Sequence, residues 1–171
     1  NSDNNFQKEI AQVKKLKLYL EQTNFLKKRQ LKIKYVELFE PNFFISKSDI
    51  SYIENFLKNG FKEKHMIIKS ANLFFQDMDK GTISFLNLKK VDMQYNERNN
   101  NDVLLSEGEI FNIPFKIAWK QDIKKSEQST NLKFKKINLN ILNSSSFIDK
   151  KSINKLQVYL NRSRYIINYN L

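Results

Sequence analysis

Hydrophobic residues occupy every second position along much of this chain, and the clearest run lies between residues 108 and 119. Five large apolar side chains alternate there with smaller or more polar ones, namely Phe111, Ile113, Phe115, Ile117 and Trp119. Successive side chains of a β-strand point to opposite faces of a sheet, so this period predicts a strand with one apolar side. Several other segments show the same period, which predicts a protein built mainly of β-strands.

Two of these segments contribute further to the expected apolar surface. In the predicted strand Met66–Gln76, simple alternation places Ala71, Leu73 and Phe75 on one face together with Ile67, and Ile68 on the other. In the predicted strand 132–142, Ile137, Leu139 and Ile141 share one face. Further strands are expected at 13–20, 31–39, 43–45, 82–88, 91–95, 103–107, 156–160 and 165–169.

Short polar segments separate these strands, including 77–81, 99–102, a loop over 121–130 and a Ser-rich turn over 143–146. Neighbouring parallel strands require a long crossover, usually a helix, and no such segment lies between the later strands. The sequence therefore predicts an antiparallel meander.

One short amphipathic helix is expected at 47–59. Ser46 and Asp49 have the spacing of a capping box, and Gly60 stands where a helix C-terminal cap is needed. Between them, an apolar stripe at helical spacing is formed by Ile50, Ile53, Phe56 and Leu57.

The composition fits a folded domain with a strong positive charge. Apolar residues make up 40% of the 171 residues, and the formal net charge is +12. A nucleic-acid partner is one interpretation of this charge, but only four of the 30 basic residues are Arg, the usual reader of bases. The lysines instead alternate with apolar residues along predicted strands, which favours the solvated face of a sheet.

Residues capable of catalysis or metal binding are sparse. The chain has no Cys and a single His, His65, so an ordinary zinc site is not expected. Asp77 and Asp79 lack the spacing of an EF-hand and are typical of a hairpin turn. Glu107 and Glu109 fall on the same side of a predicted strand and are expected to be a solvated pair. We therefore expect no enzyme activity, no metal and no cofactor.

A sheet with one apolar face must cover that face, and one short helix cannot cover six or more strands. The face must therefore fold on itself or meet another apolar surface, for which a lipid is a candidate. Four segments have distinctive patterns: 36–46, which closes a strand at Pro41; 67–77, which ends in a hairpin Asp; 83–91; and 108–115.

In these segments, and in their order over about residues 8 to 171, the chain resembles the AsmA-like family of repeating β-groove proteins, related to AsmA and TamB. The resemblance implies that residues 1–171 form a single segment of a curled β-groove. It also implies a longer chain, anchored in the bacterial inner membrane by a segment outside this sequence and exposed on its periplasmic side.

The implied function is the binding or transfer of phospholipid between the inner and outer membranes, in outer membrane biogenesis. Phospholipid acyl chains would be the partners, and no nucleic acid is expected. The groove lining would be formed by Leu73, Phe75, Phe111, Ile113, Phe115, Ile117, Trp119, Ile137, Leu139 and Ile141. Two alternatives stay open, a structural or assembly module of the envelope with a closed core, and a basic nucleic-acid-binding domain.

Overall fold

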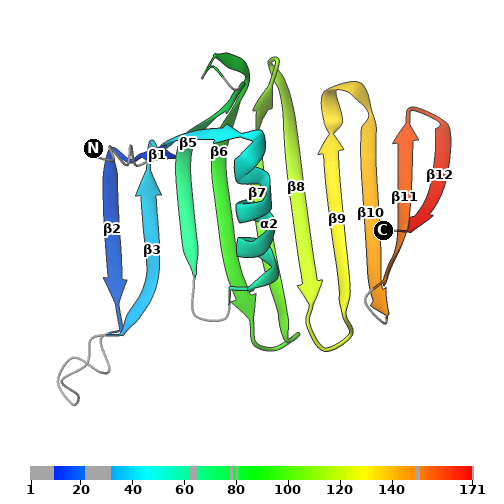
Figure 1. The fold of residues 1–171 in the computed structure, drawn as a ribbon, viewed down its shortest axis with the longest axis horizontal. Helices are drawn as coiled ribbons and strands as arrows, with labels where there is room; N and C mark the ends of the chain where they lie inside the picture. Colours follow the sequence, from blue (N-terminus) through cyan, green and yellow to red (C-terminus); the bar gives the residue numbers. More distant parts are fainter. Residues whose placement is uncertain are drawn as a thin grey trace, which may run out of the picture.

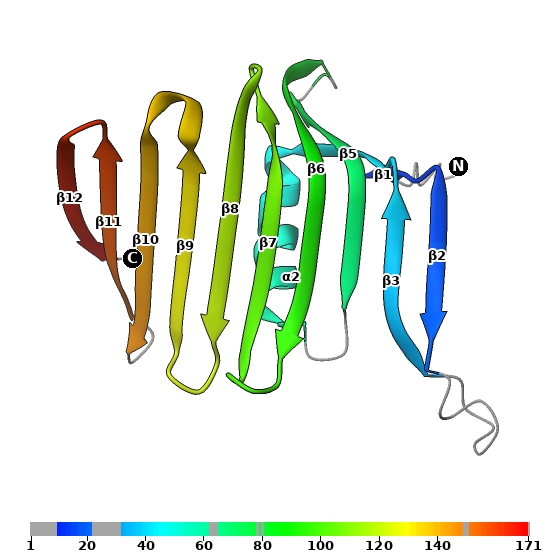
Figure 2. The ribbon, with the colours of Figure 1, turned by 180° about the vertical axis from the view of Figure 1, so that it is seen from behind.

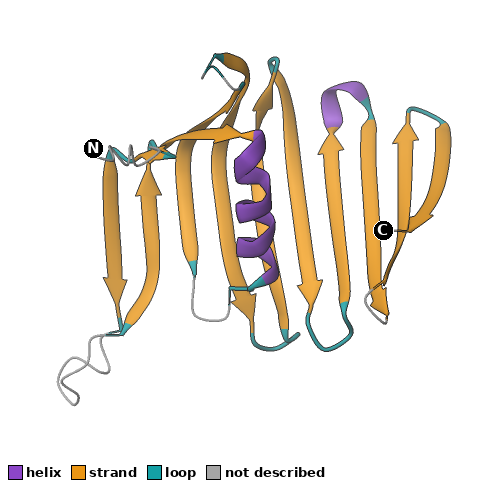
Figure 3. Ribbon diagram, viewed as in Figure 1, coloured by secondary structure: helices purple, strands orange, loops and turns teal. Residues whose placement is uncertain are grey.

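The computed structural model describes residues 10–21, 32–61, 65–77, 79, 81–148 and 151–170. Within them the protein is a single open, curled sheet of mostly antiparallel strands, with one short α-helix against it (Figure 1 and Figure 3). The mainly β fold expected from the alternation is confirmed. The strands are β1 (Ala11–Gln12), β2 (Lys15–Leu20), β3 (Ile33–Phe39), β4 (Asn42–Ser46), β5 (Met66–Gln76), β6 (Thr82–Asn96), β7 (Asn101–Ile110), β8 (Ile113–Asp122), β9 (Glu127–Phe134), β10 (Leu139–Ile148), β11 (Lys151–Leu160) and β12 (Ser163–Asn170).

Strands β5 to β12 form the expected meander, each antiparallel to the next along the chain (Figure 2). The pairing differs at the N-terminal side, where β3 and β4 both lie parallel to β5. The expectation of a purely antiparallel sheet is wrong there, because the helix between β4 and β5 provides the crossover that parallel neighbours require. Strand β2, which pairs with β3, lies at one edge of the sheet, and β12 lies at the other.

The helix begins and ends as its capping residues predict. A 3₁₀ turn, η1 (Lys47–Asp49), leads into α2 (Ile50–Lys58), and the Ser46 N–H donates to Asp49 Oδ2 at 2.8 Å. Gly60 takes a positive φ of 70° just past the helix, the conformation that ends helices and that Gly adopts without strain. In Figure 1 α2 lies in front of β6 to β8, and in Figure 2 it lies behind them, so it covers the middle of one face.

Cross-strand register assigns every paired residue to one of the two faces. One row of directly paired neighbours, called the apolar row, runs across ten strands through Leu16, Leu38, Ile68, Val91, Ser106, Ile117, Leu132, Ile141, Val158 and Tyr165. The adjacent positions on the same strands form the polar row of Lys15, Phe39, Lys69, Lys90, Glu107, Lys116, Lys133, Asn140, Tyr159 and Arg164. We call the two sides of the sheet the apolar face and the polar face accordingly.

Three inserted residues in neighbouring segments are called the bulge line: Glu40 between β3 and β4, Ser70 in β5 and Lys89 in β6. Glu40 and Ser70 have positive φ angles of 49° and 55°, and Lys89 is skipped in the pairing of β6 with β7. Each insertion shifts the alternation of its strand by one residue. The expected face of Ile67 is therefore wrong: Ile68, not Ile67, shares the apolar face with Ala71.

The bulge line also explains why β6 is one strand. The sequence predicts two strands separated at Lys89, but β6 continues through this residue with a local irregularity.

Four further expectations about local structure are corrected. Phe111 and Asn112 form a two-residue turn with φ angles of 49° and 59°, so β8 begins only at Ile113. The single strand expected at 132–142 is two strands, β9 and β10, joined through a 3₁₀ turn, η2 (Lys135–Ile137), so Ile137 does not belong to a strand. The expected polar loop 121–130 shrinks to a short turn between β8 and β9, and the Ser-rich segment 143–146 continues β10. The first part of β9 and the second half of β10 consist mostly of polar residues. Their backbone pairing defines them as strands, so a search for alternating hydrophobic residues does not find them.

Candidate functional site

The largest uniform feature of the described residues is the apolar face, and its middle is the hydrophobic core. Phe61, directly after the helix, lies between two aromatic rings, with centroid distances of 6.0 Å to Phe56 of α2 and 5.7 Å to Trp119 of β8. Buried residues of the sheet surround this contact, namely Ile68, Ala71, Val91 and Met93. The helix thus seals the centre of the face with a small, well-packed core.

Away from the helix the apolar row becomes accessible. Ile68 and Val91, in the middle, are 7% and 6% exposed, whereas Leu16 and Tyr165, at the two ends, are 54% and 57% exposed. A hydrophobic side chain gains stability only when it leaves water, so the two flanks retain unused apolar surface. The C-terminal flank comprises β9 to β12, and the N-terminal flank comprises β2 and β3.

The structure places most of the sequence-predicted lining residues on the apolar face. Phe115 and Trp119 are buried on β8, and register places them with Ile113 and Ile117 of the same strand. The other predicted lining residues that lie on this face come from β5 and β10, namely Leu73, Phe75, Leu139 and Ile141.

Two predicted lining residues stand apart. Phe111 is 79% exposed at the tip of the β7–β8 turn, and Ile137 lies in the turn between β9 and β10. Neither belongs to a strand, so neither takes part in the alternation that placed it on this face.

Several residues of the apolar face were not assigned to it from the sequence. They lie in β9, β11 and β12 and include Leu132, Phe134, Leu156, Val158 and Ile167. Phe134 contacts Phe115 across the strands, with ring centroids 6.1 Å apart. Alternation within β11 and β12 was visible in the sequence, but only the register shows which of the two alternating sets joins the face of β8.

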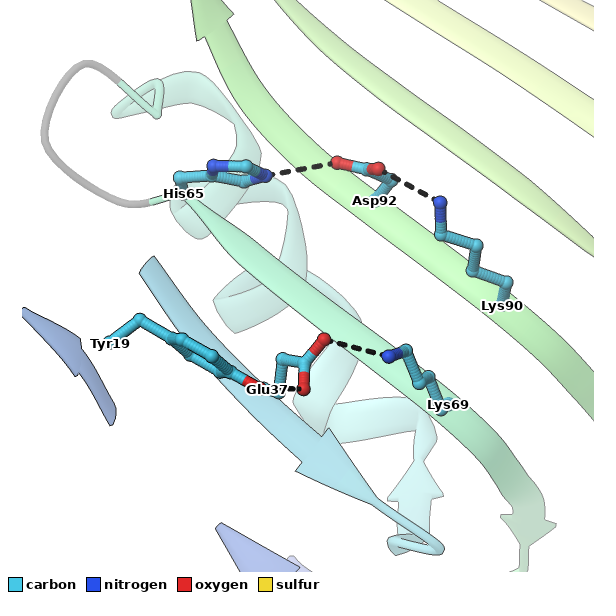
Figure 4. Close-up of polar contacts among 6 residues, drawn as sticks. All are labelled: Tyr19, Glu37, His65, Lys69, Lys90 and Asp92. Carbon is cyan, nitrogen blue, oxygen red and sulfur yellow. Dashed lines mark hydrogen bonds and ion pairs between the residues drawn. The ribbon is translucent and has the colours of Figure 1, made fainter. Parts of the chain in front are cut away.

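The polar face carries ion pairs and hydrogen bonds between neighbouring strands. Figure 4 shows that Glu37 of β3 lies between Tyr19 of β2 and Lys69 of β5. The Tyr19 hydroxyl donates to Glu37 Oε2 at 2.9 Å, and Lys69 Nζ donates to Oε1 at 2.7 Å. Glu37 is only 5% exposed, so these partners satisfy a carboxylate that is largely removed from water.

This contact sets the protonation of its members. The Lys69 ammonium holds the pKa of Glu37 below its usual range, and the hydrogen bond to Glu37 raises the pKa of Tyr19 to about 12. At neutral pH Glu37 is therefore a carboxylate and Tyr19 a neutral donor. A carboxylate of lowered pKa is a weak proton acceptor, so the arrangement suits strand pairing better than acid–base chemistry.

A second polar contact links β5 and β6 on the same face. Asp92 Oδ1 lies 3.3 Å from His65 Nε2, and Asp92 Oδ2 lies 3.1 Å from Lys90 Nζ (Figure 4). The ring of His65 also lies against Tyr35, with centroids 5.3 Å apart. Among the described residues, no group of three or more His, Cys, Asp or Glu side chains gathers where it could hold a metal ion. The Asp77 carboxylate accepts bonds from the N–H groups of Asp79 and Gly81, as a hairpin turn requires.

Compared with known proteins, the chain matches no family model and no curated protein. The likeness to the AsmA-like family therefore stays a prediction that rests on the residues quoted for it. In the part of the chain that the structure describes, no helix has the length and apolar character needed to cross a bilayer.

Proposed function

We propose that this chain binds phospholipid acyl chains along its apolar face, as a segment of an envelope protein of the AsmA-like type. In this proposal the segment works on the periplasmic side of the inner membrane and helps lipid pass toward the outer membrane. The observation that supports it is the apolar row, in which nine of ten directly paired neighbours are hydrophobic or aromatic and Ser106 is the exception.

The dimensions of the row suit an acyl chain. Strands lie about 4.8 Å apart, so nine spacings extend for about 43 Å, and the four strands of the C-terminal flank extend for about 14 Å. One leaflet of a bilayer has a hydrocarbon depth of about 15 Å, half of a core of about 30 Å. The open C-terminal flank is thus about as long as one acyl chain, and the whole row is longer.

Hydrophobic burial can supply the affinity without specific contacts. Each methylene that leaves water contributes about 0.8 kcal/mol. The apolar stripe of α2 adds to this surface, because Ile50 and Ile53 remain largely accessible while Phe56 and Leu57 of the same stripe pack on the core. In this proposal the helix covers the middle of the apolar face and borders the lipid that binds on the flanks.

Two adjacent residues of β12 offer a matched test. Ile167 is 53% exposed on the apolar face, and Ile166 is 47% exposed on the opposite face. In a vesicle assay with a fluorescent phospholipid, Ile167→Glu in the full chain should lower lipid uptake roughly tenfold, which corresponds to about 1.4 kcal/mol. Ile166→Glu introduces the same charge at the same depth of the strand and should leave uptake within twofold of the parent.

Both variants should keep the buried emission of the single tryptophan, Trp119, which checks that the fold is intact. Equal loss of uptake in the two variants would contradict a lipid path on one face. A folded parent that neither takes up labelled phospholipid nor carries any by mass spectrometry would favour the structural or assembly module instead.

A further inference from the structure

The polar face contains a depression whose positive charges are only partly balanced by acidic side chains of the described residues. It has a volume of about 410 Å³, and its lining includes three lysines, Lys90, Lys116 and Lys133, the two carboxylates of Asp92 and Glu107, and the apolar Leu105 and Ala118. Leu105 and Ala118 give it an apolar floor, and the lysines stand at its rim. Ligand sites of small molecules usually enclose about 300–1,000 Å³ with a few polar groups around apolar surface, so the depression has a suitable size.

The arrangement of the lysines is unfavourable without a partner. Lys116 of β8 and Lys133 of β9 are directly opposite in the register. Side chains in this relation lie about 5 Å apart at Cβ, where like charges destabilise a sheet. Lys116 has one acidic partner, Glu107, at 3.0 Å, and Lys90 has Asp92.

Lys133, by contrast, forms no ion pair with any described residue. A second, smaller depression of about 190 Å³ adjoins the first, since Lys116, Lys133 and Glu107 line both. It adds Lys89 and Lys135 to the rim, and of these only Lys89 has an acidic partner, Glu109, at 2.7 Å. With the partners Asp92, Glu107 and Glu109 counted, two of these five lysines, Lys133 and Lys135, form no ion pair within the described part of the chain.

We propose that this depression binds a phosphate group that carries a small organic substituent, with Lys116 and Lys133 on the phosphate oxygens and the substituent on Leu105 and Ala118. An anion between the two lysines offsets their mutual repulsion, and it accepts one charge-assisted hydrogen bond from each ammonium group. The site lies on the face opposite the apolar row, so it does not rest on the proposed lipid function. The phosphate can come from a soluble phosphate ester or from a lipid headgroup at a membrane surface.

Calorimetry on the full chain with glycerol 3-phosphate and with inorganic phosphate tests the soluble source. Lys133→Ala should weaken binding about tenfold. The control Lys155→Ala removes an exposed lysine of β11 that lies on the same face and forms no ion pair with another described residue, and binding should stay within twofold. Sedimentation with phosphatidylglycerol vesicles, against phosphatidylcholine vesicles, tests the headgroup source with the same two variants.

A Lys133-dependent response to the soluble anions supports the site with a soluble ligand, and a Lys133-dependent response to the anionic vesicles alone supports it with a headgroup. Lys133→Glu provides a second readout, because it should raise the melting temperature in phosphate-free buffer while abolishing the response. The proposal is overturned if neither source binds at millimolar phosphate, or if Lys133→Ala and Lys155→Ala weaken binding equally.

Discussion

The aromatic contact that fixes α2 to the sheet makes a quantitative prediction. Phe61 is 1% exposed and lies between the rings of Phe56 and Trp119. Truncation of a buried Phe to Ala costs about 3–5 kcal/mol, and each aromatic pair contributes about 0.5–1.5 kcal/mol beyond its buried area. Because Phe61→Ala removes two such pairs, we expect a loss in the upper half of the Phe-to-Ala range. The free energy of unfolding should therefore fall by about 4–5 kcal/mol.

The effect is measurable by urea unfolding followed through the fluorescence of Trp119. For a chain of this length each kcal/mol shifts the melting temperature by about 2–4 °C, so Phe61→Ala should lower it by about 8–20 °C. Phe111→Ala is the matched control, because it removes the same side chain from a position that is 79% exposed, and it should change stability by less than about 0.5 kcal/mol.

The reasoning would be refuted by a Phe61→Ala variant that loses less than about 1 kcal/mol. It would equally be refuted by a Phe111→Ala variant that loses as much as Phe61→Ala. Either result would mean that the helix does not depend on this contact for its position, and that the middle of the apolar face is open like its flanks.

Two further predictions concern the sheet itself. Gly108→Ala should destabilise the protein by at least about 2 kcal/mol in the same urea assay, because the added Cβ would lie 2.1 Å from the Asn87 carbonyl oxygen of the neighbouring strand; a neutral result would show that β6 and β7 can separate at this point. Glu37 stabilises the fold through the bond from Lys69 that lowers its pKa, so its contribution is complete above the usual carboxyl pKa and is lost as the pH falls through the lowered value. Melting temperatures recorded from pH 7 to pH 3 should therefore fall less for Glu37→Gln, from a lower starting value, than for the parent, and parallel curves would contradict this role.

Local sequence signals predicted the elements of this fold well. The capping residues Ser46 and Gly60 defined the helix, and alternation located parts of most strands of the meander, although most of β9 and the second half of β10 were missed. Such signals act over a few residues, within one element or one turn, which is why a single sequence contains them. The parallel pairing of β3 and β4 with β5 joins segments about 30 residues apart, and no local pattern specifies it.

The existence of an apolar face could be predicted from the sequence, but not every residue that lies on it. Trp119 and Phe115 were placed correctly because β8 is regular from Ile113 onward. Phe111 was misplaced because apolar alternation continues into a turn, and the usual turn signal, Asn followed by Gly, is absent there. Ile67 was misplaced because an inserted Ser at position 70 has no signature of its own until its φ angle is known.

The bulge line determines which side chains of these segments face the core. Hydrophobic residues before and after the line share one face only because Glu40, Ser70 and Lys89 each stay out of the alternation of the segment that contains them. Deletion of Ser70 alone would make Lys69 and Ala71 consecutive residues on opposite faces, so both halves of β5 would keep their faces and only the counterpart of Lys89 would be lost. Loss of all three residues together would restore plain alternation in each strand. An extra residue that joined the ladder at this line would instead invert one half of its strand, whereas the hairpin tips can vary in length without this effect.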